Sequence, residues 1–202
     1  MTNRINKMRT KVFVLSLCIG LTACAVKEAS NKQEQVSQKQ NSMLNSQHEQ
    51  LNTKIEELFN EAQVNATFVT FDGSKLNIYG NAQSRSDTEY VPASTFKMLN
   101  ALIALEHRKA TTIEIFKWDG KPKSIKSWEK DLTLQEAMQI STVPVYQTVA
   151  KRIGIQLMDQ EIKRIQFGNQ KIDDQIDQFW LVGPLKITPV QEAKFTYQLG
   201  TQ

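Results

Sequence analysis

The chain has 202 residues, of which 40% are hydrophobic and 23% charged, a composition typical of a globular protein. Its net charge of +4 comes from the first residues, because without the four basic residues before residue 12 the chain has 21 basic and 21 acidic residues. This balance gives no support to nucleic-acid binding, which requires a clustered basic surface. The only cysteines, Cys18 and Cys24, lie near the N-terminus, so no disulfide is expected in the folded domain.

Residues 1–24 have the pattern of an export signal. A basic head precedes an apolar core, Val12–Leu21, which is too short to span a bilayer. The ending Leu21-Thr22-Ala23-Cys24 resembles the bacterial lipoprotein cleavage box, in which the cysteine is lipidated. An ordinary signal peptide with an incidental cysteine is the alternative. Both predict export to the periplasm of a Gram-negative cell, and the first adds anchoring to the outer membrane through Cys24 as the only membrane contact.

Residues 25–50 are rich in Gln, Asn, Ser, Lys and Glu and contain no aromatic residue. Such a segment buries too little apolar surface to order itself, so a polar, flexible tether is predicted there. The folded domain is expected over residues 51–202. Its first helix is predicted over residues 46–62, from apolar residues at helical spacing: Leu51, Ile55, Leu58 and Phe59.

A β-hairpin and a buried helix come next. Thr67–Phe71 and Lys75–Tyr79 flank Asp72-Gly73-Ser74, where glycine allows the positive φ of a tight turn. Pro92 and the residues after it predict a helix over residues 92–106. Because this helix is apolar nearly all round, we expect it to be buried.

The second half of the chain is expected to be mostly helical. Residues 110–130 show no clear period and are predicted to be irregular, whereas Thr133–Glu136 has the capping-box pattern that begins a helix to Ile140. Further helices are predicted over residues 144–154 and 158–165, and from Thr188 to the end of the chain. One hairpin among so many helices is unusual, since an isolated two-stranded hairpin is marginally stable in water.

Two reactive side chains lie in the predicted helix over residues 92–106. Ser94 is in its first turn, where free N–H groups and the helix dipole favour developing negative charge, and Lys97 follows on the same face. Burial should lower the pKa of Lys97, so that its neutral amine could accept the Ser94 proton and activate this serine for acyl transfer. Chance is the alternative, because a Ser-x-x-Lys quartet is expected about once in such a chain. A second copy, Ser127–Lys130, lies in a polar run and is interpreted as surface.

Histidine chemistry is limited to two residues. His48 lies in the predicted tether, and His107 is thirteen residues beyond Ser94 on the same helix, a rise of about 20 Å. A Ser-His-Asp triad and a zinc site are therefore not expected, and both histidines are predicted to be solvated. If Ser94 is a nucleophile, Lys97 is its base, with no metal required.

Several motifs together resemble the class D serine β-lactamases, or oxacillinases, and in particular their carbapenem-hydrolysing branch. The likeness covers about Ile55–Leu199 and includes Ser94-Thr95-Phe96-Lys97, Ser141-Thr142-Val143, Phe167-Gly168-Asn169 and Phe179–Pro189. It implies an α+β fold of the serine β-lactamase and penicillin-binding transpeptidase type, a helical region plus an antiparallel sheet. It also implies a β-lactam as the small-molecule substrate, and antibiotic resistance as the consequence.

The resemblance assigns roles to the reactive residues. Ser94 would attack the lactam carbonyl and become acylated. Lys97 would be carbamylated by carbon dioxide or bicarbonate, with no other cofactor, and this N6-carboxylysine would act as the general base. Ser141 would pass a proton to the leaving nitrogen, although it could also be a helix-break residue.

The resemblance also assigns a surrounding pocket. Val143 would pack beside the carbamate and Trp180 would donate its indole N–H to it, unless Trp180 is ordinary core. Ile125 and Trp128 would line the substrate pocket. Ile125 stands where carbapenem-hydrolysing relatives often carry an aromatic residue, and Phe167 replaces a tyrosine of the family, a change that some carbapenem-hydrolysing members share.

The end of the chain departs from the family pattern. Family members continue through a Lys-Thr-Gly or Lys-Ser-Gly strand that binds the substrate carboxylate and pairs with the hairpin, and no such triplet follows Ser141 here. The expectation is a C-terminally truncated chain without these strands, which folds poorly alone and hydrolyses little. A non-hydrolytic penicillin-binding protein and an inactive lipid-anchored remnant are the alternatives. No oligomeric state follows from the sequence.

Overall fold

The computed structural model describes the backbone of residues 18–201 and the side chains of residues 32–201. Most of the predicted export signal and the side chain of Cys24 lie outside the described residues, so export and lipidation stay predictions. In the part of the chain that the structure describes, no helix is long and apolar enough to cross a membrane. The chain divides into two compact units, with the boundary after Leu58.

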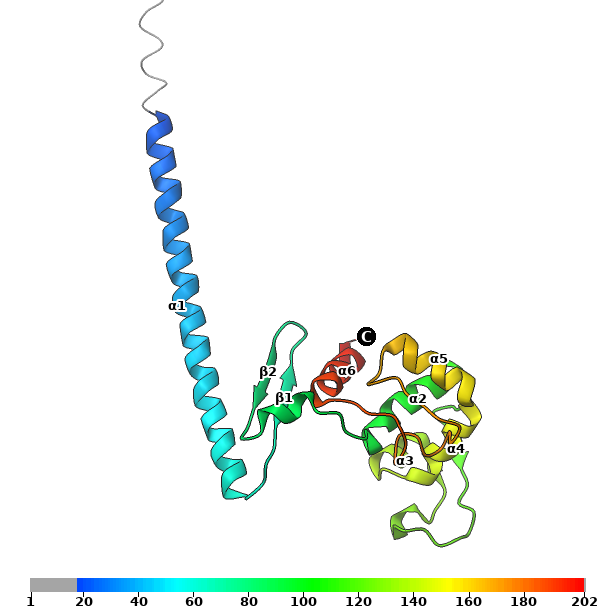
Figure 1. The fold of residues 1–202 in the computed structure, drawn as a ribbon. Helices are drawn as coiled ribbons and strands as arrows, with labels where there is room; N and C mark the ends of the chain where they lie inside the picture. The colour runs from blue at the N-terminus through cyan, green and yellow to red at the C-terminus, as the bar shows by residue number, and fades with distance from the viewer. Residues whose placement is uncertain (1–17, 202) are drawn as a thin grey trace, which may run out of the picture. The chain divides into compact units, whose positions relative to one another are not determined.

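Helix α1 (Cys18–Glu61) is one continuous helix of 44 residues (Figure 1). This corrects the expected flexible tether over residues 25–50, while the predicted helix end near residue 62 is confirmed. Burial does not explain the helix, because no side chain from residue 32 to residue 58 is buried. Its formation has a local cause instead. The segment contains no Pro or Gly between residues 21 and 72 and is rich in Gln, Glu and Lys, which lose little rotamer freedom in a helix.

The hairpin consists of β1 (Phe68–Phe71) and β2 (Leu76–Tyr79), which pair antiparallel as predicted. The register places Phe68 opposite Tyr79 and Phe71 opposite Leu76. In the turn, the Asp72 carboxylate accepts hydrogen bonds from the backbone N–H groups of Ser74 and Lys75, at 2.9 and 2.7 Å. Gly73 has φ +97°, a conformation that side chains disfavour.

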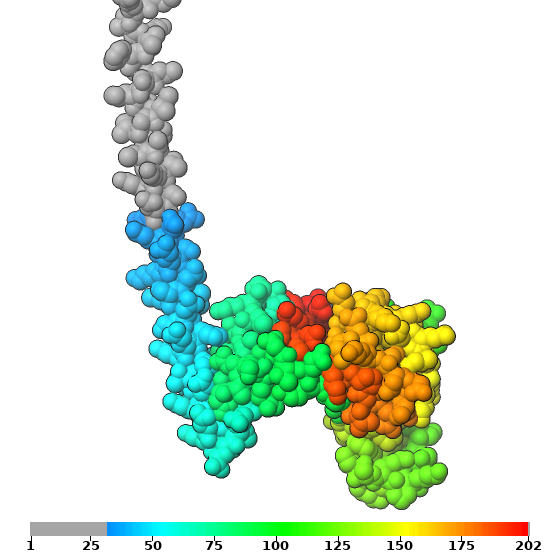
Figure 2. Space-filling view, viewed as in Figure 1, coloured from blue at the N-terminus to red at the C-terminus, as the bar shows by residue number. Residues whose placement is uncertain are grey.

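Helix α6 (Pro189–Thr201) supports the hairpin. The Phe71 ring meets the Tyr197 ring edge-on at 5.2 Å between centroids, and a Cβ on Gly73 would lie 2.2 Å from the Tyr197 hydroxyl. In Figure 2 the α6 surface (red) lies between the hairpin (teal) and the region of α5 (Ile155–Ile165, yellow to orange). The helix thus gives the two-stranded hairpin the packing partner that it needs.

A second two-stranded sheet lies in the segment that the sequence leaves irregular. Strand β3 (Ile115–Phe116) pairs antiparallel with β4 (Leu132–Thr133), and a 3₁₀ helix covers Lys126–Trp128 between them. Strands of two residues are too short to show an alternating pattern, so the sequence could not predict them. Another short 3₁₀ helix, Gln83–Asp87, follows the hairpin.

The core forms around α2 (Phe96–Glu106) and α4 (Val143–Ile153), which pack against each other. The expected helix from residue 92 is divided, since a 3₁₀ turn, Ala93–Thr95, precedes α2. Large, fully buried apolar side chains come from α2, β4, α4, α5 and the segment before α6: Phe96, Leu99 and Ile103; Leu132; Tyr146 and Val149; Met158 and Ile162; Phe179, Trp180 and Leu185. The α2 helix is not buried all round, because Leu102 and Leu105 are each 37% exposed.

The remaining helix boundaries follow local signals. Helix α3 (Leu134–Gln139) begins at the predicted capping box, in which Thr133 and Glu136 bond each other's backbone N–H. Thr188 and Gln191 form the same reciprocal contact before α6. Helix α5 begins at Ile155, three residues earlier than predicted. The fold is α+β and mostly helical, as expected, and the described residues form two small antiparallel sheets, of which only the hairpin was predicted.

Candidate active site

Ser94 lies in the 3₁₀ turn that leads into α2. The backbone N–H of the preceding residue, Ala93, donates to the carbonyl oxygen of Trp180 at 2.9 Å, which fixes this turn to a distant segment. Ser94 is exposed, whereas Lys97, one turn later, is 1% exposed. The serine therefore meets solvent directly above a buried amine.

Three polar atoms converge at this point. Lys97 Nζ lies 2.7 Å from Ser94 Oγ and 2.9 Å from Ser141 Oγ, and the two hydroxyl oxygens are 3.0 Å apart. Ser94 and Lys97 meet because they are three residues apart at the start of a helix. Ser141 comes from the break between α3 and α4, 44 residues further along the chain. Each pair is within the distance that proton transfer requires.

Burial governs the charge of Lys97. Its neighbours on α2, Phe96 and Leu99, are fully buried, and within residues 32–201 no carboxylate forms an ion pair with its amine. Desolvation lowers the pKa of Lys97 from its ordinary value of 10.5. The site therefore favours the neutral amine, the form that accepts a proton or adds to carbon dioxide.

The backbone is strained on both sides of the site. Ala93 has φ +48° and Ser141 has φ +55°, left-handed values that cost about 1 kcal/mol or more outside glycine. Hydrogen bonds hold the Ser141 break in place, since its N–H donates to Met138 O at 3.1 Å and the N–H of Thr142 donates to Ala137 O at 2.8 Å. These two hydrogen bonds hold Ser141 in the break between α3 and α4.

Trp180 is completely buried, with its indole stacked on the Phe96 ring at 5.3 Å between centroids. Its Nε1–H has no hydrogen-bond partner among the described residues. A buried indole N–H usually has an acceptor, because leaving it unpaired costs about 1–3 kcal/mol. Trp180 packs on Phe96, the residue before Lys97. Its unpaired indole N–H therefore indicates where an acceptor group would be held.

The other residues assigned by resemblance lie at the edge of the site. Val143 is half-buried as the first residue of α4, two residues after Ser141. Trp128 donates its indole N–H to Ile140 O at 3.1 Å, which ties it to the residue before Ser141. Ile125, by contrast, is 47% exposed at the start of the 3₁₀ helix. Val143 and Trp128 are thus held next to the Ser141 break, the first by its place in the chain and the second by its hydrogen bond to Ile140. No such contact holds Ile125 there among the described residues.

One buried carboxyl group beside the site escaped the sequence analysis. Both carboxylate oxygens of Glu192 are buried without a hydrogen-bond partner among the described residues. The nearby Thr95 hydroxyl donates to Pro92 O at 2.9 Å, and its closeness to Glu192 offsets part of the effect of burial on the Glu192 pKa. Burial raises the pKa of Glu192 above its ordinary value of 4.5. The sequence around Glu192, in the first turn of α6, does not predict that its carboxyl group is buried, because Thr95 and Glu192 are far apart in the chain.

The prediction that His107 is solvated needs correction. His107 Nε2 lies 3.2 Å from a carboxylate oxygen of Glu161, which is 6% exposed. Arg164 pairs with Glu161 and also, at 3.2 Å, with Glu106. The potential ligand atoms of the three residues Glu106, His107 and Glu161 lie within 4.8 Å of one another, and the Arg164 guanidinium already supplies positive charge there.

Comparisons with known proteins now identify the family. The sequence profile of the penicillin-binding protein transpeptidase domain matches residues 25–201. The chain belongs to this transpeptidase family. Among curated members it is 43% identical over 142 residues to β-lactamase OXA-10 of Pseudomonas aeruginosa, covering 70% of this chain and 53% of that protein. It is 34% identical over 148 residues to β-lactamase OXA-48 of Klebsiella pneumoniae, covering 70% and 54%.

Solved structures of this transpeptidase family give the same result. The class D β-lactamase FUS-1 (OXA-85) of Fusobacterium nucleatum subsp. polymorphum superposes with a TM-score of 0.69 at 34% identity, over 74% of this chain and 62% of that chain. The BPu1 β-lactamase superposes with a TM-score of 0.68 at 35% identity, over 72% and 62%. The resemblance to class D β-lactamases is confirmed, and the chain spans about half the length of the curated relatives it matches.

Proposed function

We propose that this protein hydrolyses β-lactams as a class D serine β-lactamase, with Ser94 as the nucleophile. One observation carries the proposal: the buried Lys97 amine, which has no ion-pair partner among the described residues, lies 2.7 Å from Ser94 Oγ. Burial lowers the pKa of this amine and so favours its neutral form, which can accept a proton. A serine next to a base is the arrangement required for acyl transfer. The class D relatives support the choice of a cyclic amide as substrate.

The short distances among these three side chains support a proton path for the proposed reaction. As Ser94 Oγ forms its bond to the lactam carbonyl carbon, its proton passes to the base at residue 97. The backbone N–H groups at the start of α2 favour the negative charge that develops on the carbonyl oxygen. The ring C–N bond then breaks, and Ser141 Oγ, within 3.0 Å of both other atoms, donates a proton to the leaving nitrogen and is reprotonated from residue 97.

We further propose that Lys97 is carbamylated. The neutral amine adds to carbon dioxide and loses a proton, so a lowered lysine pKa is the prerequisite. The unpaired Trp180 N–H fits a carboxylate acceptor. Val143, two residues after Ser141, is the apolar side chain that we propose beside the carbamate. When present, the carbamate supplies an anionic general base for acylation and for the water that releases the product. Besides water and the substrate, the proposed chemistry uses carbon dioxide, which bicarbonate supplies in solution.

The test is hydrolysis of a chromogenic cephalosporin by the purified chain, with bicarbonate present and absent, against Ser94→Ala. We expect turnover that bicarbonate increases and that the Ser94→Ala control lacks. Equal turnover in the control would contradict the proposal. A carbapenem in the same assay tests the likeness to the carbapenem-hydrolysing branch. A carbonyl signal from ¹³C-bicarbonate that is lost in Lys97→Ala would test the carbamate independently.

A non-hydrolytic penicillin-binding protein is the second candidate. It is supported by the match to the penicillin-binding protein transpeptidase domain over residues 25–201. Its signature is a stable penicilloyl adduct on Ser94 without turnover, whereas the hydrolase releases the adduct.

For either activity we propose export to the periplasm, supported by the basic and apolar pattern of residues 1–24. Anchoring through Cys24 would then place the site where β-lactams meet the cell wall.

A further inference from the structure

Helix α1 carries a regular row of exposed leucines. Leu44, Leu51 and Leu58 recur every seven residues and are 48, 46 and 62% exposed. Because seven residues complete almost two turns of an α-helix, the three side chains lie on one face. The helix propensity of its polar residues accounts for α1 as a helix, but it gives no reason for a periodic row of leucines in contact with water.

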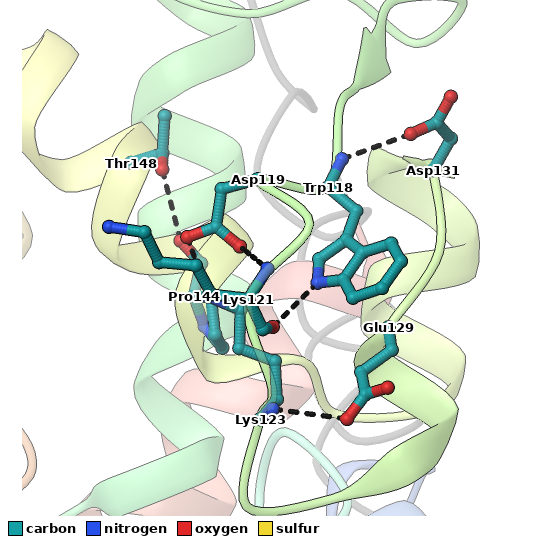
Figure 3. A network of polar contacts seen from close by, with 8 residues as sticks. All are labelled: Trp118, Asp119, Lys121, Lys123, Glu129, Asp131, Pro144 and Thr148. Carbon is teal, nitrogen blue, oxygen red and sulfur yellow. Dashed lines mark hydrogen bonds and ion pairs between the residues drawn. The ribbon is translucent and has the colours of Figure 1, made fainter.

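Exposed apolar side chains also occur elsewhere in the described chain, and single ones are normal in a soluble protein. Trp118 is an example, since it is 37% exposed and its indole N–H donates to Lys121 O at 2.8 Å within its own loop (Figure 3). The leucines of α1 differ from it because they follow the seven-residue period at which two helices pair in a coiled coil.

The residues between the leucines complete a heptad pattern, in which positions a and d face the second helix. With the leucines at d, the a positions hold Asn41, His48 and Ile55. Leucine at d with a β-branched residue at a favours two strands, and an asparagine at a specifies the register at a cost in stability. These six residues, which we call the leucine seam, therefore have the composition of a weak, parallel two-stranded coiled coil.

The placement of charge favours pairing with an identical helix. Between residues 37 and 58, four of the five charged side chains lie at the outer positions b, c and f: Lys39, Glu49, Glu56 and Glu57. Lys54 is the one charge at a position flanking the seam. The flanking positions before it hold neutral amides: Gln38, Gln40, Asn45, Gln47 and Asn52. Two copies in register therefore meet without like-charge repulsion along most of the seam.

We propose that α1 pairs with α1 of a second copy of this chain, as a parallel two-stranded coiled coil through the leucine seam. The leucines and Ile55 lose their contact with water, and the Asn41 side chains of the two copies face each other. A parallel pair brings both N-terminal ends of α1 together, which is compatible with anchoring of both copies in one membrane. The proposal is independent of β-lactam hydrolysis, since no residue of the seam belongs to the Ser94 site.

The first experiment is analytical ultracentrifugation of the full chain at concentrations up to about 300 μM, where we expect a monomer–dimer equilibrium with a Kd of about 100 μM or less. Leu51→Gln should weaken association at least about tenfold, because it removes a buried leucine from each helix. Met43→Gln is the matched control, since Met43 is 57% exposed on the same helix but at an outer position. A monomer throughout this range, a trimer, or equal effects of the two variants would overturn the proposal.

A gain of affinity tests the seam from the opposite direction. His48→Ile replaces a polar a residue with the type that favours two strands, and should tighten association at least about tenfold. Gln50→Ile adds the same side chain at the outer position c and should change association little. Equal tightening in the two variants, or none in His48→Ile, would contradict the seam.

Cross-linking tests the parallel register. Ser37 lies at position d, one heptad before Leu44, and Ser42 lies at the outer position b; both are exposed. In a background with Cys18→Ser and Cys24→Ser, Ser37→Cys should form a disulfide-linked dimer on mild oxidation, because the two d positions face each other. Ser42→Cys should remain monomeric on denaturing gels. No cross-link at residue 37, or equal cross-linking at both positions, would rule out the parallel pair.

Discussion

The chain contains the pattern Ser-x-x-Lys twice, and the two copies lie in opposite environments. In the first, Ser94 and Lys97 stand at the start of a helix whose inner face is core, and Lys97 is 1% exposed. In the second, Ser127 and Lys130 lie in and just after a 3₁₀ helix, and both are exposed. Desolvation lowers the pKa of Lys97, whereas the second lysine keeps its contact with water.

The difference shows that the four-residue pattern is not itself the active site. What makes the first copy chemically useful is the removal of water from the lysine and the arrival of a third group, Ser141, at 2.9 Å. Both come from tertiary packing, of α2 against α4 and of Trp180 against Phe96. The comparison therefore yields variants in which the two copies should respond differently.

The largest difference is expected between the two serines. Ser94→Ala removes the nucleophile and should lower β-lactam turnover by about a thousandfold or more, whereas Ser127→Ala should leave it unchanged. Initial rates with a chromogenic cephalosporin measure both. A loss in Ser127→Ala similar to that in Ser94→Ala would show that the second copy takes part in the chemistry.

The next effect tests the base. Lys97→Ala should slow acylation by about a hundredfold to ten-thousandfold and leave any adduct that forms trapped on Ser94. Added bicarbonate should not restore the rate, because the variant has no amine to carbamylate. Stopped-flow acylation and the lifetime of the adduct separate the two steps. Undiminished turnover in Lys97→Ala would remove this residue from the mechanism.

A smaller effect extends the comparison of buried and exposed groups to carboxylates. The pKa of Glu192 is raised above 4.5 by burial, so the folded protein keeps a proton that the unfolded chain loses. Its stabilising contribution is complete below pH 4.5 and is lost as the pH rises through the folded pKa. Glu192→Gln should therefore raise the melting temperature at pH 7 by roughly 2–4 °C and change little at pH 4.

Thermal melts at both pH values measure this effect, with Glu89→Gln as the control because Glu89 is exposed. The control should change little at either pH. A Glu192→Gln melting temperature that is lower at pH 7 than that of the unmodified chain would mean that the carboxylate has a partner that stabilises it.

Local signals explain which parts of the fold were predictable. The hairpin turn around Gly73, the capping box of Thr133 and the restart of a helix near Pro144 each depend on residues adjacent in sequence, and the structure confirms all three. Helix α1 also has a local cause, an unbroken run of helix-favouring polar residues. The lack of apolar surface in the same residues predicts a flexible tether, and the two signals conflict there.

The site was predictable only in part. Helical spacing places Lys97 beside Ser94, but the contact of Ser141 across 44 residues came from resemblance to a family and not from the local pattern. The unpaired groups of Glu192 and Thr142 could not be predicted, because nothing in the neighbouring sequence shows that packing will bury them. Sequence patterns locate a nucleophile well and its tertiary surroundings poorly.

The most direct test of the central claim is the intact mass of the chain after exposure to a penicillin at neutral pH. If Lys97 is a buried base that activates Ser94, one penicillin should add covalently to the unmodified chain and to Ser127→Ala. It should not add to Ser94→Ala, and it should add far more slowly to Lys97→Ala. An adduct that persists in Ser94→Ala, or that forms equally fast in Lys97→Ala, would contradict the account.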